Sequence, residues 1–229
     1  MQIFLLVFMV ALALCMWGRK RYRKIYDAEA ANLISSGITG EQIARRILEE
    51  RGVAGVAVVR SRSLLADSYD PAQRRISLAP QHFGGSTYSA LGIAANLAGQ
   101  AIQHHEGHRP VFWRASAVKA TVYLCIPLLV IGIFTVLAGM NKTLLPMVLL
   151  VWSLVAIGNL ATIPTELDAG ERAKKQLHKI RAFRNLDERV GVERVMGASS
   201  TMYADGFSTV FGWLHATILP WAKKQVAGE

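Results

Sequence analysis

Three uncharged apolar runs constrain this chain more than any other feature of its sequence. They cover residues 3–17, 121–140 and 144–163. The second and third approach the roughly 20 residues that a helix needs to cross about 30 Å of hydrocarbon. The first is shorter, but a basic cluster follows it, whereas a signal peptide has its basic residues in front. We therefore expect three transmembrane helices, of which the first is an uncleaved anchor over residues 1–18.

The basic residues gather beside these runs and account for much of the net charge of +10. Such a distribution is typical of the cytoplasmic ends of membrane spans. It predicts an external N-terminus, with residues 19–119 and 166–229 in the cytoplasm. No nucleic-acid recognition module accompanies the charge, so we expect no nucleic-acid partner. The residues expected at the membrane surface are Arg19, Lys20, Arg21, Arg23, Lys24, Trp113 and Arg114.

The segments between the spans have the patterns of a small mixed domain. Thr39 and Gln42 have capping-box spacing at the start of a helix that Gly52 should end. Strands are expected at 53–59 and 75–78, separated by a polar loop that includes 67–71, and a longer helix is expected over 88–104. Apolar side chains at helical spacing over 207–218 predict an amphipathic helix, either interfacial or packed on the bundle.

These patterns predict an α-rich membrane protein with three transmembrane helices, a small α+β cytoplasmic domain and a C-terminal amphipathic helix. The expected division is an anchor at 1–18, a cytoplasmic domain at 19–119, a transmembrane hairpin at 120–165 and a cytoplasmic helical segment at 166–229. Cys15 and Cys125 lie in separate apolar runs, so they offer neither a disulfide framework nor a metal knuckle.

A series of short motifs resembles those of a known family. The motifs are TGEQIARRIL at 39–48, DSYDP at 67–71, ISLAP at 76–80, ALGIAA at 90–95, AIQHHEG at 101–107 and IPTELDA at 163–169. In this order and spacing the chain resembles the bacterial YugP-type neutral zinc metallopeptidases, which are membrane-anchored. The resemblance implies a zincin-like helix in the cytoplasmic domain and a multi-pass location in a bacterial cytoplasmic (inner) membrane.

The zinc motif of that family, HExxH, falls on residues 96–100, which here read NLAGQ. In the motif, histidines at i and i+4 face one zinc ion, and the glutamate activates a water molecule. Asn96 and Gln100 keep the facing geometry, but amides are poor zinc ligands, and Leu97 accepts no proton. Glu166 occupies the acidic position that the resemblance suggests for a third ligand. We therefore expect a degenerate site with no catalytic residue and no zinc.

A histidine cluster follows the same helix and offers an alternative metal site. His104 and His108 have i,i+4 spacing, but the glutamate stands two places after the first histidine, and Gly107 and Pro110 disfavour continued helix. The other interpretation is that these are polar residues at a helix end close to lipid headgroups.

The sequence thus favours a catalytically inactive, metallopeptidase-like pseudoenzyme that serves as a scaffold, assembly factor or accessory subunit of a membrane protein complex, without a cofactor. Its expected partners are membrane lipids and another membrane protein or complex. The alternative is an active membrane-anchored zinc metallopeptidase with displaced ligands. A third hypothesis is a protein that only binds the lipid surface, through its basic clusters and terminal helix.

Overall fold

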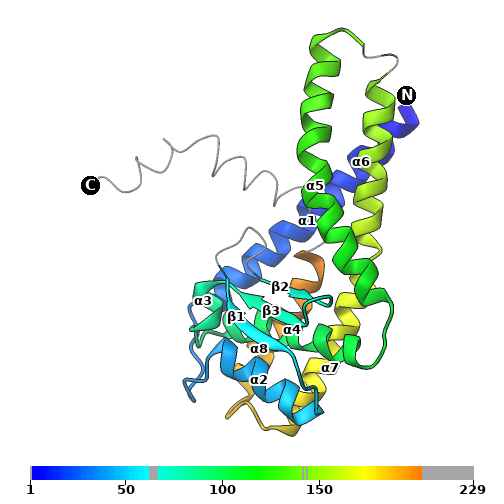
Figure 1. Ribbon diagram of the computed structural model, residues 1–229. Coiled ribbons are helices and arrows are strands. Elements are labelled where there is room, and N and C mark those ends of the chain that lie inside the picture. Colours follow the sequence, from blue (N-terminus) through cyan, green and yellow to red (C-terminus); the bar gives the residue numbers. More distant parts are fainter. Residues whose placement is uncertain (1, 62–66, 141, 143, 203–229) are drawn as a thin grey trace, which may run out of the picture.

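The computed structural model describes residues 2–61, 67–140, 142 and 144–202, and this part is mostly helical with one small sheet (Figure 1). Its elements are α1 (Gln2–Ala30), α2 (Gly40–Arg51), β1 (Ala57–Arg60), β2 (Ser68–Asp70), β3 (Arg75–Leu78), α3 (Pro80–Phe83), α4 (Tyr88–His105), α5 (Pro110–Leu137), α6 (Leu145–Leu160), α7 (Ile163–Lys179) and α8 (Leu186–Met202). The amphipathic helix predicted at 207–218 lies outside the described residues.

Helix α2 begins and ends where its sequence predicts. The Thr39 side chain accepts from the Gln42 backbone N–H at 3.4 Å, and Gln42 Oε1 accepts from the Thr39 backbone N–H at 3.0 Å. This capping box satisfies N–H groups that the first turn leaves without an intrahelical partner. Gly52 ends the helix at φ 73°, a left-handed conformation that glycine adopts without a steric penalty. The buried face of the helix consists of Gly40, Ile43, Ala44, Ile47 and Leu48.

The sheet has the order β1-β3-β2, with β1 parallel and β2 antiparallel to β3. The position of β3 confirms the predicted second strand. The first strand is shorter than predicted, because Gly55 has φ 75° and the extended run begins after it, at Ala57. The predicted polar loop at 67–71 is wrong in part, since β2 lies within it and its central Tyr69 is 3% exposed. Three alternating residues are too few for a pattern to distinguish a strand from a turn.

Helix α4 is the centre of the domain, and nearly all of its side chains are buried. It packs against α2, α7 and α8, and also contacts β2 and β3. Two glycines permit the closest contacts. A Cβ at Gly99 would lie 2.0 Å from the backbone oxygen of Ala169 in α7, and one at Gly92 would lie 2.8 Å from Val195 in α8. The backbones of α4 and α7 therefore touch, which brings polar side chains on the facing turns within hydrogen-bonding distance.

We expect Gly99→Ala to lower the free energy of unfolding by about 1–3 kcal/mol, because the added methyl group must displace the Ala169 backbone. Gly197→Ala in α8 is the matched control. No neighbouring atom lies within 4 Å of that Cβ position, so this replacement should stabilise the helix by about 0.5–1 kcal/mol. Denaturant unfolding in detergent measures both changes, and equal effects would contradict the close approach of α4 and α7.

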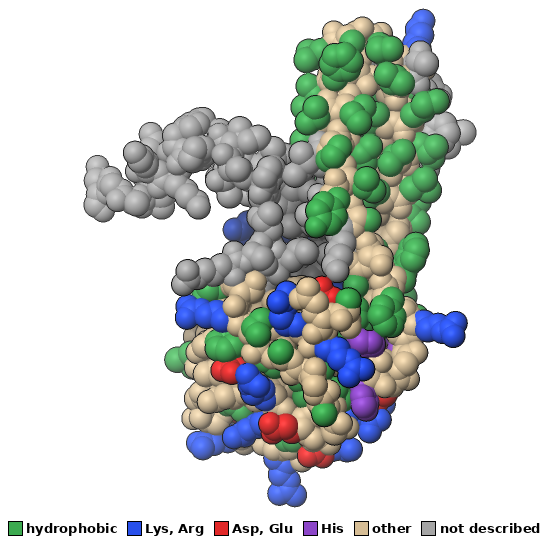
Figure 2. Space-filling model, in the orientation of Figure 1, with side chains coloured by type: hydrophobic (Ala, Val, Ile, Leu, Met, Phe, Trp, Pro, Cys, Tyr) green, Lys and Arg blue, Asp and Glu red, His purple; other side chains and the backbone are tan. Residues whose placement is uncertain are grey.

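Helices α5 and α6 form a hairpin that rises from the domain, with α1 running beside it (Figure 1). Hydrophobic side chains cover the hairpin, whereas charged side chains gather on the domain (Figure 2). Tyr123 is 75% exposed and Leu137 is 80% exposed, although both are apolar or aromatic. A continuous apolar surface of this kind indicates contact with a membrane or with another protein.

One helical run in the described residues, Leu145–Lys179 over α6 and α7, is long and apolar enough to cross a membrane. Within α5, Pro127–Leu137 is a shorter apolar stretch. The predicted number of three transmembrane helices is therefore not confirmed. The structure confirms the coarser part of the predicted fold class, a helix-rich chain with a small sheet.

After the hairpin, the chain returns to the same domain. Helices α7 and α8 both pack against α4, and α8 also packs against α1. Leu177 of α7 and Val192 and Val195 of α8 are buried in the same hydrophobic cluster as the side chains of α2, α4 and the sheet. The segments before and after the hairpin therefore share one core, and the residues that face α4 come from both.

Candidate metal centre

Glu166 lies where three helices meet. It is in the first turn of α7, which begins at Ile163 with Pro164 at a position that tolerates proline. Its side chain is fully buried, at 0% exposed. The first turn of a helix favours a carboxylate, because the helix dipole is positive there. A fully buried carboxylate nevertheless needs hydrogen-bond donors and a counter-charge from its neighbours.

Three side chains donate to this carboxylate. Asn96 Nδ2 and Gln100 Nε2, one turn apart on α4, lie 3.1 Å and 2.9 Å from Glu166 Oε2. Arg114 of α5 donates from Nε to Glu166 Oε1 and forms an ion pair with it. All three donors are buried, at 2%, 0% and 3% exposed. The structure thus brings Asn96, Gln100 and Glu166 together and adds Arg114 to them.

The carboxylate also fixes the orientation of the two amides. Their NH₂ groups face Glu166, and in the described part of the chain neither Asn96 Oδ1 nor Gln100 Oε1 has a hydrogen-bond partner. Reversing either amide would place its oxygen against a carboxylate oxygen, and neither atom carries a proton to share. Both amides therefore act as donors to Glu166, and their lone pairs point away from it.

Leu97 occupies the position that holds the glutamate in an HExxH motif. It is 1% exposed and belongs to the hydrophobic core cluster. Leucine has no group that can take a proton from water, so no general base stands here. The helix face next to the two amides is therefore core in this chain.

A second polar network extends from the end of α4. Gln103 Nε2 donates to Asp168 Oδ2 at 2.6 Å, and Arg172 pairs with the same oxygen at 2.6 Å. Arg172 also pairs with Glu106, which in turn pairs with Arg51 of α2 at 2.7 Å. Gln103 is not among the residues that the sequence predicts for the site, although its place on the same helix face, one turn after the motif, could have indicated it.

The alternative metal ligands His104 and His108 are not on one helix. Helix α4 ends at His105, so the i,i+4 geometry of a helical site does not extend to His108. His104 Nδ1 instead lies 2.6 Å from Tyr69 Oη, and its ring packs edge-on against Phe112 with centroids 5.0 Å apart. Among the described residues, no group of three or more His, Cys, Asp or Glu side chains is placed to hold a metal ion.

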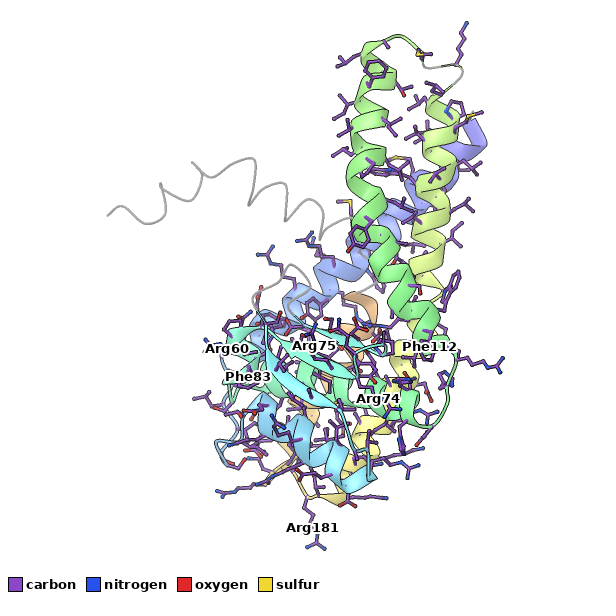
Figure 3. All side chains as sticks on the ribbon, viewed as in Figure 1. Arg60, Arg74, Arg75, Phe83, Phe112 and Arg181 are labelled. Carbon is purple, nitrogen blue, oxygen red and sulfur yellow. The ribbon has the colours of Figure 1, made fainter. Side chains whose placement is uncertain are left out.

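Burial sets the protonation of the pair formed by Tyr69 and His104. It raises the pKa of Tyr69 to about 12, against an opposing effect of Arg74. Burial lowers the pKa of His104 from 6.5, and Arg74 and His105 lower it further. Arg74 and Phe112 lie on the side of the domain from which α5 rises (Figure 3). At neutral pH the phenol keeps its proton and can donate it to the neutral imidazole.

We expect the stability of the protein to depend on pH through His104. Its pKa is lower in the folded state, so the unfolded state binds more protons once the pH falls below about 6.5. The contribution of the neutral imidazole is complete above that pH and is lost as the pH falls toward the folded-state pKa. Between about pH 7.5 and about pH 5.5, the free energy of unfolding should fall more for the wild type than for His104→Gln. Equal losses would contradict this.

The basic cluster that follows the first apolar run lies along α1, and its exposed members are Lys20, Arg21, Arg23 and Lys24, with Arg19 half-buried. Trp113 is 58% exposed. Arg114 differs from the prediction that placed it at the membrane surface, because it is 3% exposed and contacts Glu166. Hydropathy alone does not distinguish an arginine that reaches toward headgroups from one that reaches into the adjoining domain.

The side chains around Glu166 do not fit a zinc ion. Zinc is held by three or four imidazole, thiolate or carboxylate ligands at about 2.0–2.3 Å. Here the carboxylate is paired with a guanidinium, and the two α4 side chains present N–H groups to it in place of lone pairs. These side chains therefore support no hydrolytic step through a metal at this position.

Comparison with known proteins identifies the relatives of this chain. The family described as "Putative neutral zinc metallopeptidase" matches residues 3–218. The chain is also 30% identical over 204 residues to the "Putative membrane protease YugP" of Bacillus subtilis (strain 168), which covers 88% of this chain and 89% of that protein. No solved structure matches.

These matches correct one prediction. The sequence predicts a protein without a cofactor, and this prediction is wrong, because the family's description as a zinc metallopeptidase points to zinc. The side chains around Glu166 in this chain do not fit that metal. Because the family match extends over nearly the whole sequence and the Bacillus protein aligns over a similar length, the chain belongs to the neutral zinc metallopeptidase family.

Proposed function

We propose that this chain is a catalytically inactive member of its family, which acts as a scaffold, assembly factor or accessory subunit of a membrane protein complex. The observation that carries the proposal is the state of Glu166, whose carboxylate is bound by Arg114, Asn96 and Gln100. Leu97 stands where a general base is needed, and loss of that assistance alone lowers a rate on the order of 10²- to 10⁴-fold.

A binding role is supported by the surface of the α5–α6 hairpin. Its apolar side chains are exposed and suit membrane lipids or the helices of a membrane protein. Contact through this surface requires no hydrolysis.

The same proposal places the protein in a bacterial cytoplasmic membrane with three spans and the domain in the cytoplasm. It is supported by the Bacillus relative named as a membrane protease, by the run Leu145–Lys179 and by the basic residues beside the spans. Cysteine labelling from outside the cell tests it, in a background without Cys15 and Cys125. Ser36→Cys and Lys179→Cys should be protected and Lys142→Cys, in the turn between the two apolar runs, should be reactive, and labelling of either protected position would overturn this topology.

We expect the purified full-length protein not to cleave casein in a chelator-sensitive way. The assay is run in detergent beside a known zinc peptidase and beside Glu166→Gln. Cleavage that is abolished by a chelator and also by Glu166→Gln would contradict the proposal that the protein is catalytically inactive. In mild detergent, the protein should also migrate with a membrane partner at fixed stoichiometry, whereas a protein that only binds lipid would migrate alone.

The family match favours a second candidate, an active zinc metallopeptidase whose ligands are displaced to His104 and His108. This candidate predicts chelator-sensitive cleavage that survives Asn96→Ala and Gln100→Ala but is lost in His104→Ala. The same set of variants therefore separates the two functions.

A further inference from the structure

Arg114 and Glu166 bring a cation from α5 to a carboxylate on α7, directly beside the former motif on α4. Both side chains are almost completely removed from solvent, at 3% and 0% exposed. We infer that the Arg114 guanidinium takes the place of the metal's charge at this site, so that Arg114 and a zinc ion are mutually exclusive partners of Glu166. This inference concerns binding alone and does not rest on the proposed function.

Charge compensation is the first argument. A carboxylate in a protein interior is strongly destabilising unless a cation or a protonation change neutralises it. The contacts from α4 are amides, which donate hydrogen bonds but carry no charge. The positive charge in contact with Glu166 comes from Arg114. In an HExxH site the metal supplies that charge, so the arginine is needed only where the metal is not held.

Use of the lone pairs is the second argument. Arg114 Nε approaches Glu166 Oε1, while Asn96 and Gln100 share Oε2, so both carboxylate oxygens are engaged. A metal ligand must offer a lone pair at about 2 Å. Two like charges, a zinc ion and a guanidinium, would then lie within a few ångströms of each other in a buried site, where repulsion is weakly screened. Histidines at 96 and 100 would therefore not suffice to rebuild the centre while Arg114 stays in place.

The choice of arginine is the third argument. Its guanidinium remains charged at any physiological pH and is more weakly hydrated than an ammonium group, so it is suited to a buried ion pair. Arg114 also links the first turns of α5 to the first turn of α7, whereas Asn96 and Gln100 link α4 to the same carboxylate. The ion pair is thus both the counter-charge and the junction between the hairpin and the domain.

The test compares zinc binding by three full-length variants in detergent. The first restores the two ligand positions with Asn96→His and Gln100→His and keeps Arg114. The second adds Arg114→Met to these two changes, and the third adds Arg109→Met, a matched loss of an exposed arginine about one turn earlier. Competition against a chromophoric chelator measures the affinity. We expect Arg114→Met to raise zinc affinity on the order of 100-fold, and Arg109→Met to leave it unchanged.

Equal zinc affinity with and without Arg114 would overturn the inference, and so would a failure of the Arg114→Met variant to bind zinc in any folded form. If that variant unfolds without metal, zinc should restore its cooperative unfolding transition, as in other sites where metal binding and folding are coupled. A further variant replaces Arg114→Met by Arg114→Gln in the same background. We expect it to show the same gain in zinc affinity. Peptidase activity of the unmodified protein would contradict the proposed function but not this result.

Discussion

Arg114→Met is expected to lower the free energy of unfolding by about 3–5 kcal/mol, because it leaves the Glu166 carboxylate buried without its counter-charge. Methionine is similar in length to the arginine stem and is apolar, so the loss of packing is small beside the loss of charge. The remaining contacts of Glu166, from Asn96 and Gln100, are neutral donors. Chemical denaturation in detergent, or the shift of the thermal midpoint, measures the change.

A double-mutant cycle separates the ion pair from other effects of the substitution. Glu166→Gln removes the buried charge, so adding it to Arg114→Met should recover most of the lost stability, and the two changes should be strongly non-additive. Arg109→Met is the control at an exposed position in the preceding turn, where surface substitutions change stability by less than about 0.5 kcal/mol. Additive effects of Arg114→Met and Glu166→Gln would show that the two side chains do not stabilise each other.

Local signals in the sequence predicted the elements that depend on neighbouring residues. The capping box at Thr39 and Gln42, the glycine that ends α2 and the position of β3 are all confirmed. The three residues of β2 were missed, because so short an element depends on pairing with β3 and on the burial of Tyr69. The shared core of α7, α8 and α4 was also missed, since a charged helix with a narrow apolar stripe has the same pattern whether it packs on a domain or lies in solvent.

The candidate site, like the fold, could be predicted only in part from the sequence. The position of the altered motif on a helix could be predicted, because i and i+4 side chains share a face. The meeting of Asn96 with Glu166, 70 residues away, was suggested by the family resemblance and not by any local pattern. The sequence predicts Arg114 at the membrane surface, since an arginine just before an apolar run is usually an anchor. Only the direction of α5 relative to α4 and α7 shows that it is the counter-charge of Glu166.

Leu97→Glu is expected to destabilise the domain strongly, because it places an ionisable group at a position that is 1% exposed and inside the hydrophobic core cluster. A loss of about 4 kcal/mol or more is expected at neutral pH, which is the range typical of an unpaired buried charge. No peptidase activity should appear, since a general base without a held metal or substrate water completes no site. Association with a membrane partner should weaken if the partner docks near this helix.

Two controls at the same position distinguish charge from packing. Leu97→Met keeps the volume and should cost less than about 1.5 kcal/mol, whereas Leu97→Gln keeps the shape of glutamate without its charge. Burial would raise the pKa of the new carboxyl in the folded state, so its cost should shrink as the pH falls and the carboxyl becomes neutral. The free energy of unfolding of Leu97→Glu should therefore approach that of Leu97→Gln at acid pH and lie well below it at neutral pH. Identical stability of the two at every pH would mean that position 97 reaches water, and the reading of this helix face as core would be wrong.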